Sequence, residues 1–238
     1  MTDIAHRCAV IAQSVAEAAK RAGREPSQIT VVAVSKRKPV NDMLLYAAAA
    51  QAQGMQVVFG ENYVQELKLK YPEVRELGSI HLIGPLQTNK IKEAVRCADV
   101  IESAHSPRVI EGIAKEARAL GKRQSIFIQV NIGDDPLKSG FHADQLTEAC
   151  QAVRMHKDSL ALSGLMTITP YYSDPEGARK DFRAMSDLRS RLQASPAIEI
   201  FENRTIYLSM GMSSDFEIAI EEGADLVRVG TALFGERQ

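Results

Sequence analysis

Short apolar runs alternate with amphipathic segments from residue 29 onward, and this alternation limits the possible folds more than any other feature of the sequence. The candidate strands are residues 29–36, 56–61, 79–84, 99–103, 125–131, 160–168, 205–211 and 225–235. Helical patterns lie between them, such as 106–120, where apolar residues share one face and Gly121 stops the helix. Eight parallel strands joined by crossover helices close most readily into a barrel. We therefore predict an α/β fold, a single (β/α)8 TIM barrel, with a doubly wound open sheet as the alternative.

Residues 1–24, MTDIAHRCAVIAQSVAEAAKRAGR, predict an amphipathic helix that precedes the barrel. This segment lacks the uninterrupted apolar core of a signal peptide, and no window of the chain has the length and apolarity of a membrane span. No Pro/Gly/Ser-rich linker or change of composition interrupts the chain. We expect one domain over residues 1–238, in a soluble cytoplasmic protein.

The composition argues against several classes of function. Lys and Arg total 29 against 30 Asp and Glu, and no basic block appears, so nucleic acid is not an expected partner. The three cysteines, Cys8, Cys97 and Cys150, are widely scattered and suggest a reducing compartment rather than a disulfide framework. The five histidines show no metal-ligand spacing, so we expect no metal site.

Lys36 follows the first apolar run, ITVVAVSK. Barrel enzymes carry their working residues at the carboxyl ends of the strands, and Lys36 shares the parity of Val32 and Val34. A lysine that is partly desolvated there loses proton affinity and becomes a usable amine nucleophile. The alternative is an ordinary solvated loop lysine.

The segments after the seventh and eighth runs suggest a phosphate site. Ser213 and Ser214 open a predicted helix, and Ser214 with Glu217 matches a capping box. Gly230 and Thr231 follow the apolar part of the last run, where glycine lets a phosphate approach the backbone closely. Barrels often bind phosphate at these two loops. Ordinary capping and a glycine turn are the alternative for either loop alone.

Arg228 lies inside the last run, between two valines. A buried guanidinium needs an acceptor, which is either a carboxylate in the barrel interior or a ligand atom. A lysine amine, a phosphate-binding loop and an arginine together describe a site for an aldehyde that carries a phosphate. Pyridoxal 5′-phosphate and a sugar-phosphate aldolase substrate both fit this description.

The sequence also resembles a known family along nearly its whole length. The matching segments are VAVSKRKP, FGENYVQE, HLIGPLQTNK, KSGF, GLMTI, LSMGMSSDFEIAI and VRVGTALFG. In this order and spacing they resemble the pyridoxal-phosphate homeostasis proteins. The resemblance implies a barrel like the N-terminal domain of alanine racemase.

The resemblance also implies a set of site residues. Pyridoxal phosphate would be carried as an internal aldimine on Lys36, with Arg228 facing the pyridine nitrogen and Asn62 at the edge of the ring. The phosphate would be held by Ser213, Gly230 and Thr231, with Ser209 close by. His81 would be either a neighbour of this pocket or a core histidine. Lys38, Lys90 and Lys138 would be solvated loop residues or a second amine that accepts the aldehyde during transfer.

Arginine stays protonated near neutral pH, so Arg228 would leave the pyridine nitrogen unprotonated and the cofactor a weak electron sink. A racemase also needs a second acid/base group, which in alanine racemase is a tyrosine from another domain, whereas this chain ends at Gln238. We therefore expect a monomeric, non-catalytic carrier that maintains vitamin B6 homeostasis and delivers the cofactor to apo-enzymes. The alternatives are a racemase-like enzyme, a lysine Schiff-base aldolase and an interaction module in which Lys36 is incidental.

Overall fold

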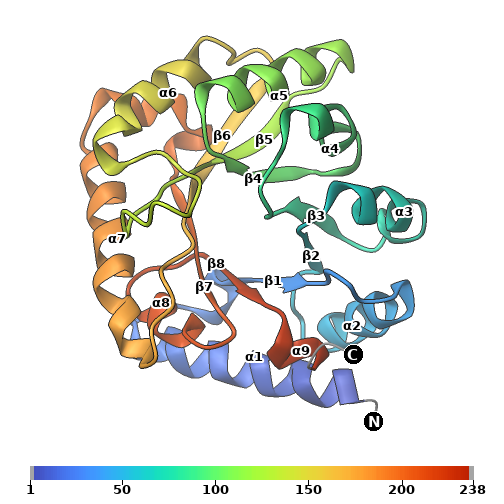
Figure 1. Ribbon diagram of the computed structural model, residues 1–238. Helices are drawn as coiled ribbons and strands as arrows, with labels where there is room; N and C mark the ends of the chain where they lie inside the picture. Colours follow the sequence, from blue (N-terminus) through green and yellow to red (C-terminus); the bar gives the residue numbers. More distant parts are fainter. Residues whose placement is uncertain (1–2, 236–238) are drawn as a thin grey trace.

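The strands form one closed barrel. The computed structural model describes residues 3–235, and in it the eight strands are parallel and neighbour one another in chain order, with β8 returning to β1 (Figure 1). The strands are β1 Thr30–Val34, β2 Val58–Glu61, β3 Ser79–Leu82, β4 Val100–Ala104, β5 Gln124–Gln129, β6 Leu160–Met166, β7 Tyr207–Met212 and β8 Leu226–Val229. This confirms the predicted barrel, and the open-sheet alternative is wrong.

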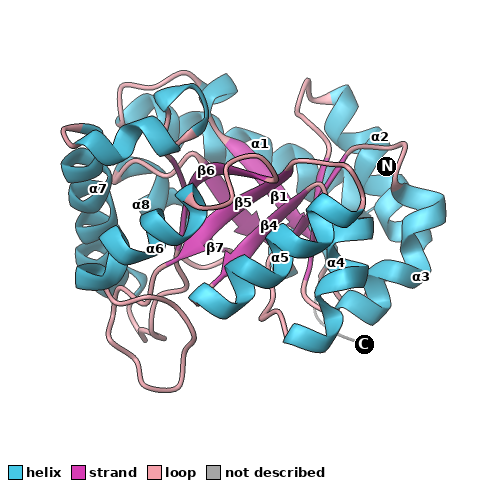
Figure 2. Ribbon diagram, turned by 90° about the horizontal axis from the view of Figure 1, so that it is seen from above, coloured by secondary structure: helices cyan, strands magenta, loops and turns pink. Residues whose placement is uncertain are grey.

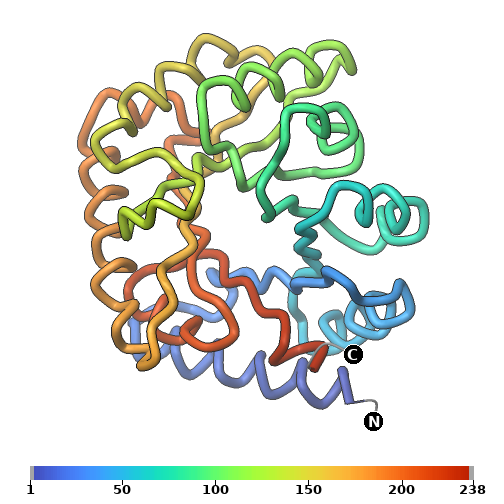
Figure 3. Tube along the Cα trace, in the orientation of Figure 1, coloured from blue at the N-terminus to red at the C-terminus, as the bar shows by residue number. Residues whose placement is uncertain are grey.

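Helices cover the outside of the barrel, as the view from above shows (Figure 2). They are α1 Asp3–Arg21, α2 Val40–Ala52, α3 Val64–Val74, α4 Ile91–Cys97, α5 Pro107–Ala119, α6 Leu146–Arg154, α7 Arg179–Gln193, α8 Phe216–Glu221 and α9 Thr231–Phe234. The Cα trace therefore moves around a ring, one strand and one helical segment at a time (Figure 3). Among these helices, none has a stretch long and apolar enough to cross a bilayer.

The predicted first helix, α1, is present and packs against α2, α8 and α9. Its apolar stripe is buried, with Cys8 and Ala18 fully inaccessible. At its carboxyl end, Arg21 forms ion pairs with Glu217 at 2.8 Å and with Glu221 at 2.7 Å. This helix therefore ties the start of the chain to the segment that follows β7.

Several predicted boundaries are wrong, and two of them have a clear local cause. The run 29–36 ends as a strand at Val34, because the chain turns there and Arg37 adopts a left-handed conformation, with φ of 59°. The run 225–235 ends as a strand at Val229, and residues 231–234 form the single turn α9. Phe234 packs against Tyr46 of α2, with ring centroids 5.9 Å apart. A short apolar run is compatible with either a strand or a buried helical turn. At residues 231–234 the packing of Phe234 favours the helical turn.

The predicted capping box is also wrong. Helix α8 begins at Phe216 and its N-cap is Asp215, so Ser214 does not cap it. The Asp215 carboxylate accepts a hydrogen bond from the backbone N–H of Met212 at 2.6 Å, which closes the turn after β7. By contrast, α5 begins as predicted, with the hydroxyl of Ser106 accepting from the Val109 N–H.

The barrel interior contains both apolar and polar side chains. Its apolar part is a cluster of buried residues from six points around the ring, namely Val32, Val58, Ile83, Phe127, Met166 and Leu226. Buried polar side chains lie on the strands as well, and four of them are linked by hydrogen bonds: His81 on β3, Glu102 on β4, Ser209 on β7 and Arg228 on β8. Barrel interiors are usually filled by branched apolar residues, so this polar set requires an explanation.

Candidate functional site

A cavity of about 540 Å³ opens at the carboxyl ends of the strands. Six of the seven residues predicted for the cofactor site line it: Lys36, Asn62, Ser213, Arg228, Gly230 and Thr231. They come from β8 and from the segments after β1, β2, β7 and β8, which are distant in sequence and adjacent in the closed barrel. The seventh, Ser209, is fully buried beneath the cavity and does not form part of its wall.

Lys36 lies in the turn after β1, and its side chain faces the cavity together with Val34, as the strand parity predicts. The residue before it is held firmly. The Ser35 hydroxyl donates to Glu61 Oε1 at 2.7 Å, and Lys70 Nζ donates to the Ser35 carbonyl oxygen at 2.8 Å. The two partners also bond to each other, with Lys70 Nζ 2.8 Å from Glu61 Oε1.

The residue after Lys36 is held by the same group of side chains. Glu66 accepts the Arg37 backbone N–H at 2.5 Å and pairs with Lys70 Nζ at 2.6 Å. This buried lysine therefore connects the two sides of the turn, and the turn fixes where the Lys36 amine can reach. Burial raises the pKa of the Glu61 carboxyl above its ordinary value, although Lys70 and Ser35 act in the opposite direction.

A hydrogen bond joins the loops after β7 and β8. The Ser213 hydroxyl accepts the backbone N–H of Gly230 at 3.1 Å. A Cβ on Gly230 would lie 3.3 Å from Val34 Cβ, so glycine lets this loop approach β1 closely. The hydroxyls of Ser213 and Thr231 and the backbone around Gly230 thus gather at one end of the cavity, where an anionic oxygen would find several donors.

Arg228 forms part of the cavity wall with 4% of its surface exposed. It donates through Nη1 to Ser209 Oγ at 2.7 Å and through Nη2 to the Thr167 carbonyl oxygen at 2.6 Å. Burial lowers the pKa of Arg228, while the charges of Glu102 and Asp215 raise it. Arginine's ordinary pKa is so high that the group remains a cation. The sequence predicted either a carboxylate partner or a ligand atom for this guanidinium. The structure shows part of each, because Arg228 is connected to the Glu102 carboxylate through Ser209 and also borders the cavity.

Asn62 lines this cavity and also carries an unsatisfied polar atom. Its Oδ1 is buried and has no hydrogen-bond partner within residues 3–235. A buried acceptor without a donor is unfavourable by about 1–3 kcal/mol, so such an atom usually marks a place for a ligand or a water. The set of an amine, hydroxyl and amide donors, a guanidinium and this acceptor fits a polar, phosphate-bearing aldehyde.

Sequence reasoning did not select the apolar part of the wall. Ile83 and Ile168 lie at or beyond the ends of β3 and β6, so the strand-end rule that selected Lys36 would also have found them. Met212 and Tyr171 complete the wall. Tyr171 lies in the loop after β6 with 93% of its surface exposed, and no sequence pattern marked it.

The other predicted neighbours are not among the residues that line this cavity. His81 is buried in the barrel interior, with Nδ1 2.6 Å from Glu102 Oε1. Lys38 Nζ donates to the Phe234 carbonyl oxygen at 3.0 Å, and Lys138 Nζ donates to the carbonyl oxygens of Ile168 and Thr169. These two lysines are therefore not simple solvated loop residues. Lys90 is half-buried in the short turn before α4.

Comparison with known proteins identifies the family. Residues 8–238 match the family described as alanine racemase, N-terminal domain. The pyridoxal phosphate homeostasis protein of Aquifex aeolicus is 36% identical over 233 residues, covering 98% of this chain and 97% of the relative. The protein of the same name from Escherichia coli K12 is 37% identical over 245 residues, covering 100% and 98%. The chain belongs to the pyridoxal phosphate homeostasis protein family.

A solved structure of a similar protein has the same fold as this chain. PipY of Synechococcus elongatus PCC7942, a structure described as having pyridoxal phosphate bound, superimposes with a TM-score of 0.79 at 31% identity. The match covers 98% of this chain and all of PipY. The resemblance noted in the sequence and the fold expected from it are both confirmed.

Proposed function

We propose that this protein binds pyridoxal 5′-phosphate in the cavity at the carboxyl ends of the strands and maintains vitamin B6 homeostasis as a carrier. The observation that carries the proposal is the meeting of Lys36, the joined loops of Ser213 and Gly230, and Arg228 around one cavity. Membership of the family supports it, and so does the similarity to PipY, whose structure has pyridoxal phosphate bound.

Each residue has a role in this proposal. When bound, the cofactor supplies an aldehyde carbon with which the Lys36 amine can condense, releasing one water. Ser213, Gly230 and Thr231 hold the phosphate, Arg228 faces the pyridine nitrogen, and Asn62 borders the ring. Ser209 holds Arg228 by hydrogen bonding and does not touch the phosphate, because it is fully buried below the cavity. Val34, Ile83 and Ile168 offer apolar surface to the ring.

The same residues favour retention of the cofactor over turnover of substrates. Arg228 is a cation and a hydrogen-bond donor, so it keeps the pyridine nitrogen unprotonated and weakens its capacity to withdraw electrons. We place the protein in the cytoplasm as a monomer that passes the cofactor to apo-enzymes. No metal is part of this proposal.

One observation favours residual racemase-like activity as a second candidate. Tyr171 borders the cavity and is the kind of side chain that could act as the second acid/base group. With 93% of its surface exposed, it is not held at a fixed position above the cavity. Steady racemisation of an amino-acid panel that disappears in Tyr171→Phe would establish this activity. That result would replace the carrier proposal.

The deciding experiment is an absorption spectrum of the purified protein with added cofactor, before and after borohydride. Wild type and the control Lys90→Ala should show a visible band, and borohydride should fix the cofactor on the peptide that contains Lys36. Lys36→Ala should lack the band. A wild-type protein that stays colourless with excess cofactor, or a label on another lysine, would contradict the proposal. A Schiff base with a sugar phosphate would be colourless, which separates the aldolase alternative.

A further inference from the structure

A hydrogen-bonded chain crosses the barrel interior beneath the cofactor cavity. Arg228 Nη1 donates to Ser209 Oγ at 2.7 Å, and the Ser209 hydroxyl donates to Glu102 Oε2 at 2.6 Å. The other carboxylate oxygen, Oε1, lies 2.6 Å from His81 Nδ1. All four residues are buried, between 0% and 6% exposed, so the chain of hydrogen bonds runs through the protein interior.

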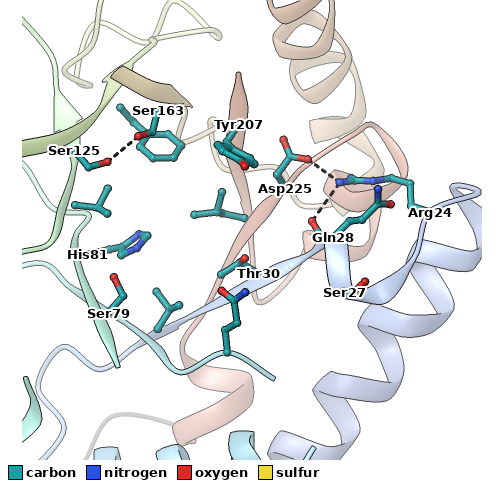
Figure 4. A pocket seen from close by; sticks show the side chains of 15 residues that line it. Arg24, Ser27, Gln28, Thr30, Ser79, His81, Ser125, Ser163, Tyr207 and Asp225 are labelled. Carbon is teal, nitrogen blue, oxygen red and sulfur yellow. Dashed lines mark hydrogen bonds and ion pairs between the residues drawn. The ribbon is translucent and has the colours of Figure 1, made fainter. Parts of the chain in front are cut away.

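The far end of this chain borders a second cavity. It has a volume of about 570 Å³ and is lined by the amino ends of the strands, including Thr30, Ser79, Ser125 and Tyr207 (Figure 4). Figure 4 shows the His81 ring among these polar side chains. Because Nδ1 is used by Glu102, Nε2 is the nitrogen left to exchange a proton with solvent in this cavity. The chain therefore connects the two ends of the barrel.

Few charged groups face His81. Glu102 on β4 is bonded to it, and Arg228 on β8 follows through Ser209, with Asp215 acting on Arg228 from the loop after β7. On β2, the residue paired with His81 is Gly60, while Glu61 is engaged by Lys70 and Ser35. At the cavity wall are the Tyr207 phenol and the Arg24–Asp225 ion pair, whose atoms are 2.7 Å apart. The remaining wall is uncharged: Ser27, Gln28, Thr30, Gln56, Val58, Ser79, Val100, Ser125, Phe127, Ser163 and Leu226.

Glu102 links the two cations of the chain. Burial would raise the pKa of Glu102, but the hydrogen bond and charge of His81, together with Arg228 and Ser209, lower it below the ordinary value. The carboxylate therefore stays ionised across the neutral range. When His81 is neutral, Glu102 balances Arg228 alone. When His81 is protonated, the same carboxylate is shared between two cations. The electrostatic potential at the cofactor cavity then becomes more positive.

We propose that His81 and Glu102 are positioning residues of the cofactor site, and that a proton taken up by His81 from the lower cavity strengthens the hold of Arg228 on the cofactor. This inference rests on the proposed function, because it requires Arg228 to face the bound ring. The cofactor carries an anionic phosphate and an electron-rich pyridine nitrogen, so a more positive potential at Arg228 favours binding. Neither positioning residue touches the cofactor.

The test compares the dissociation constant of pyridoxal 5′-phosphate at about pH 5.5 and about pH 8, which brackets the ordinary titration of histidine. His81→Gln keeps an N–H donor for Glu102 but cannot take up a proton. The cofactor phosphate also titrates, but its contribution is common to all variants and cancels when the pH ratios are compared. We expect the wild-type ratio of pH 8 to pH 5.5 constants to exceed that of His81→Gln by about threefold to tenfold, which corresponds to at most about one pH unit of coupling.

Two further variants sharpen the result. Ser209→Ala interrupts the chain while leaving His81 in place, and it should reduce the ratio to the His81→Gln value. His156→Gln makes the same substitution at a histidine that bonds Arg118 outside the barrel, and it should keep the wild-type ratio. By linkage, loading the protein with cofactor should also raise the pH at which the His81 ring-proton NMR signal titrates. The same coupling sets this shift and the ratio of dissociation constants, so a tenfold ratio corresponds to a shift of about one pH unit. If His81→Gln does not fold, the NMR titration and Ser209→Ala decide alone.

Three results would overturn the inference while leaving the proposed function intact. Equal ratios for wild type and His81→Gln, or a His81 signal that titrates identically in free and loaded protein, would show that the chain is only structural. A matching loss in His156→Gln would show that the effect is not carried by the chain. If the wild-type protein binds no pyridoxal phosphate, the proposed function fails and this inference fails with it, whereas cofactor binding with equal ratios removes the inference alone.

Discussion

Replacing Lys70 by methionine should destabilise the protein and loosen the turn that carries Lys36. The side chain of Lys70 is 9% exposed and bonds Glu61, Glu66 and the Ser35 carbonyl. Methionine retains most of the stem of lysine, so little cavity forms. The Glu61 carboxylate, whose side chain is 0% exposed, would instead be left with the Ser35 hydroxyl as its remaining hydrogen-bond partner among the described residues.

The expected magnitude follows from this burial. Removing one partner of a buried ion pair costs about 3–5 kcal/mol, because the remaining charge stays buried without compensation. We expect about 3 kcal/mol for Lys70→Met, since Glu61 can take up a proton to relieve the penalty. For a chain of this length, such a loss lowers Tm by roughly 6–12 °C. The matched control is Lys68→Met on the same helix. Lys68 is 60% exposed and lies 3.3 Å from Glu93, so its loss should cost under about 1 kcal/mol.

The pH dependence of the unfolding free energy gives a second, independent test of the role of Lys70. Burial already raises the pKa of Glu61, and Lys70 opposes that rise, so the pKa rises further in Lys70→Met. A carboxyl with a raised folded-state pKa favours folding at low pH, and this contribution is lost as pH rises through that pKa. The deficit of Lys70→Met should therefore be smaller near pH 5 than near pH 8.

Urea unfolding of wild type, Lys70→Met and Lys68→Met at both pH values measures these differences, and borohydride trapping reports the Lys36 turn. We expect Lys70→Met to trap less cofactor on Lys36 than Lys68→Met under conditions where both are folded. Equal unfolding free energies for the two variants, or a deficit for Lys70→Met that grows as pH falls, would refute the reasoning.

Two further predictions concern Gly211 in β7 and Ser213 in the loop that follows it. Gly211→Ala should lower the unfolding free energy by about 2–3 kcal/mol, because Gly211 has φ of +89° and the new Cβ would lie 2.5 Å from Ala219 Cβ. The control Gly54→Ala, with φ of +68° and no atom within 4 Å, should cost about 1 kcal/mol in the same urea titration. Ser213→Ala removes the acceptor for the Gly230 N–H, so we expect about 1 kcal/mol of lost stability. It should also weaken cofactor binding in equilibrium dialysis, and unchanged affinity would exclude Ser213 from the phosphate site.

The fold was predictable because each strand is a short apolar run bounded by turns, and the eighth pairs with the first without further information. The errors lie where local pattern and tertiary packing compete. Residues 231–234 are apolar enough for a strand. They form a helical turn instead, and this turn packs the Phe234 ring against Tyr46. Ser214 and Glu217 have the spacing of a capping box, but Asp215 closes the turn first.

The cavity residues were predictable for a related reason. A parallel barrel brings all the carboxyl ends of its strands to one face, so Lys36, Ser213 and Gly230 were expected to meet, whereas Asn62 was expected only from the family resemblance. The chain from His81 to Arg228 was not predictable. It depends on the register between strands and on how far the Glu102 side chain reaches, and sequence spacing gives neither. Ser209 was expected close to the phosphate; the geometry adds that it is fully buried, bonds Glu102 and Arg228, and does not line the cavity.

The polar layer in the barrel interior is hard to explain by stability alone. Replacing a buried ionic group by well-packed apolar side chains is often neutral or stabilising, and branched residues usually fill this part of a barrel. Here two pairs of adjacent strands, β3 with β4 and β7 with β8, contribute His81, Glu102, Ser209 and Arg228 instead. A structural role would require only that each polar atom be satisfied, which a closed internal network would achieve. This layer ends at a cavity on each side of the barrel, at Arg228 and at His81, so its form is that of a connection between the two.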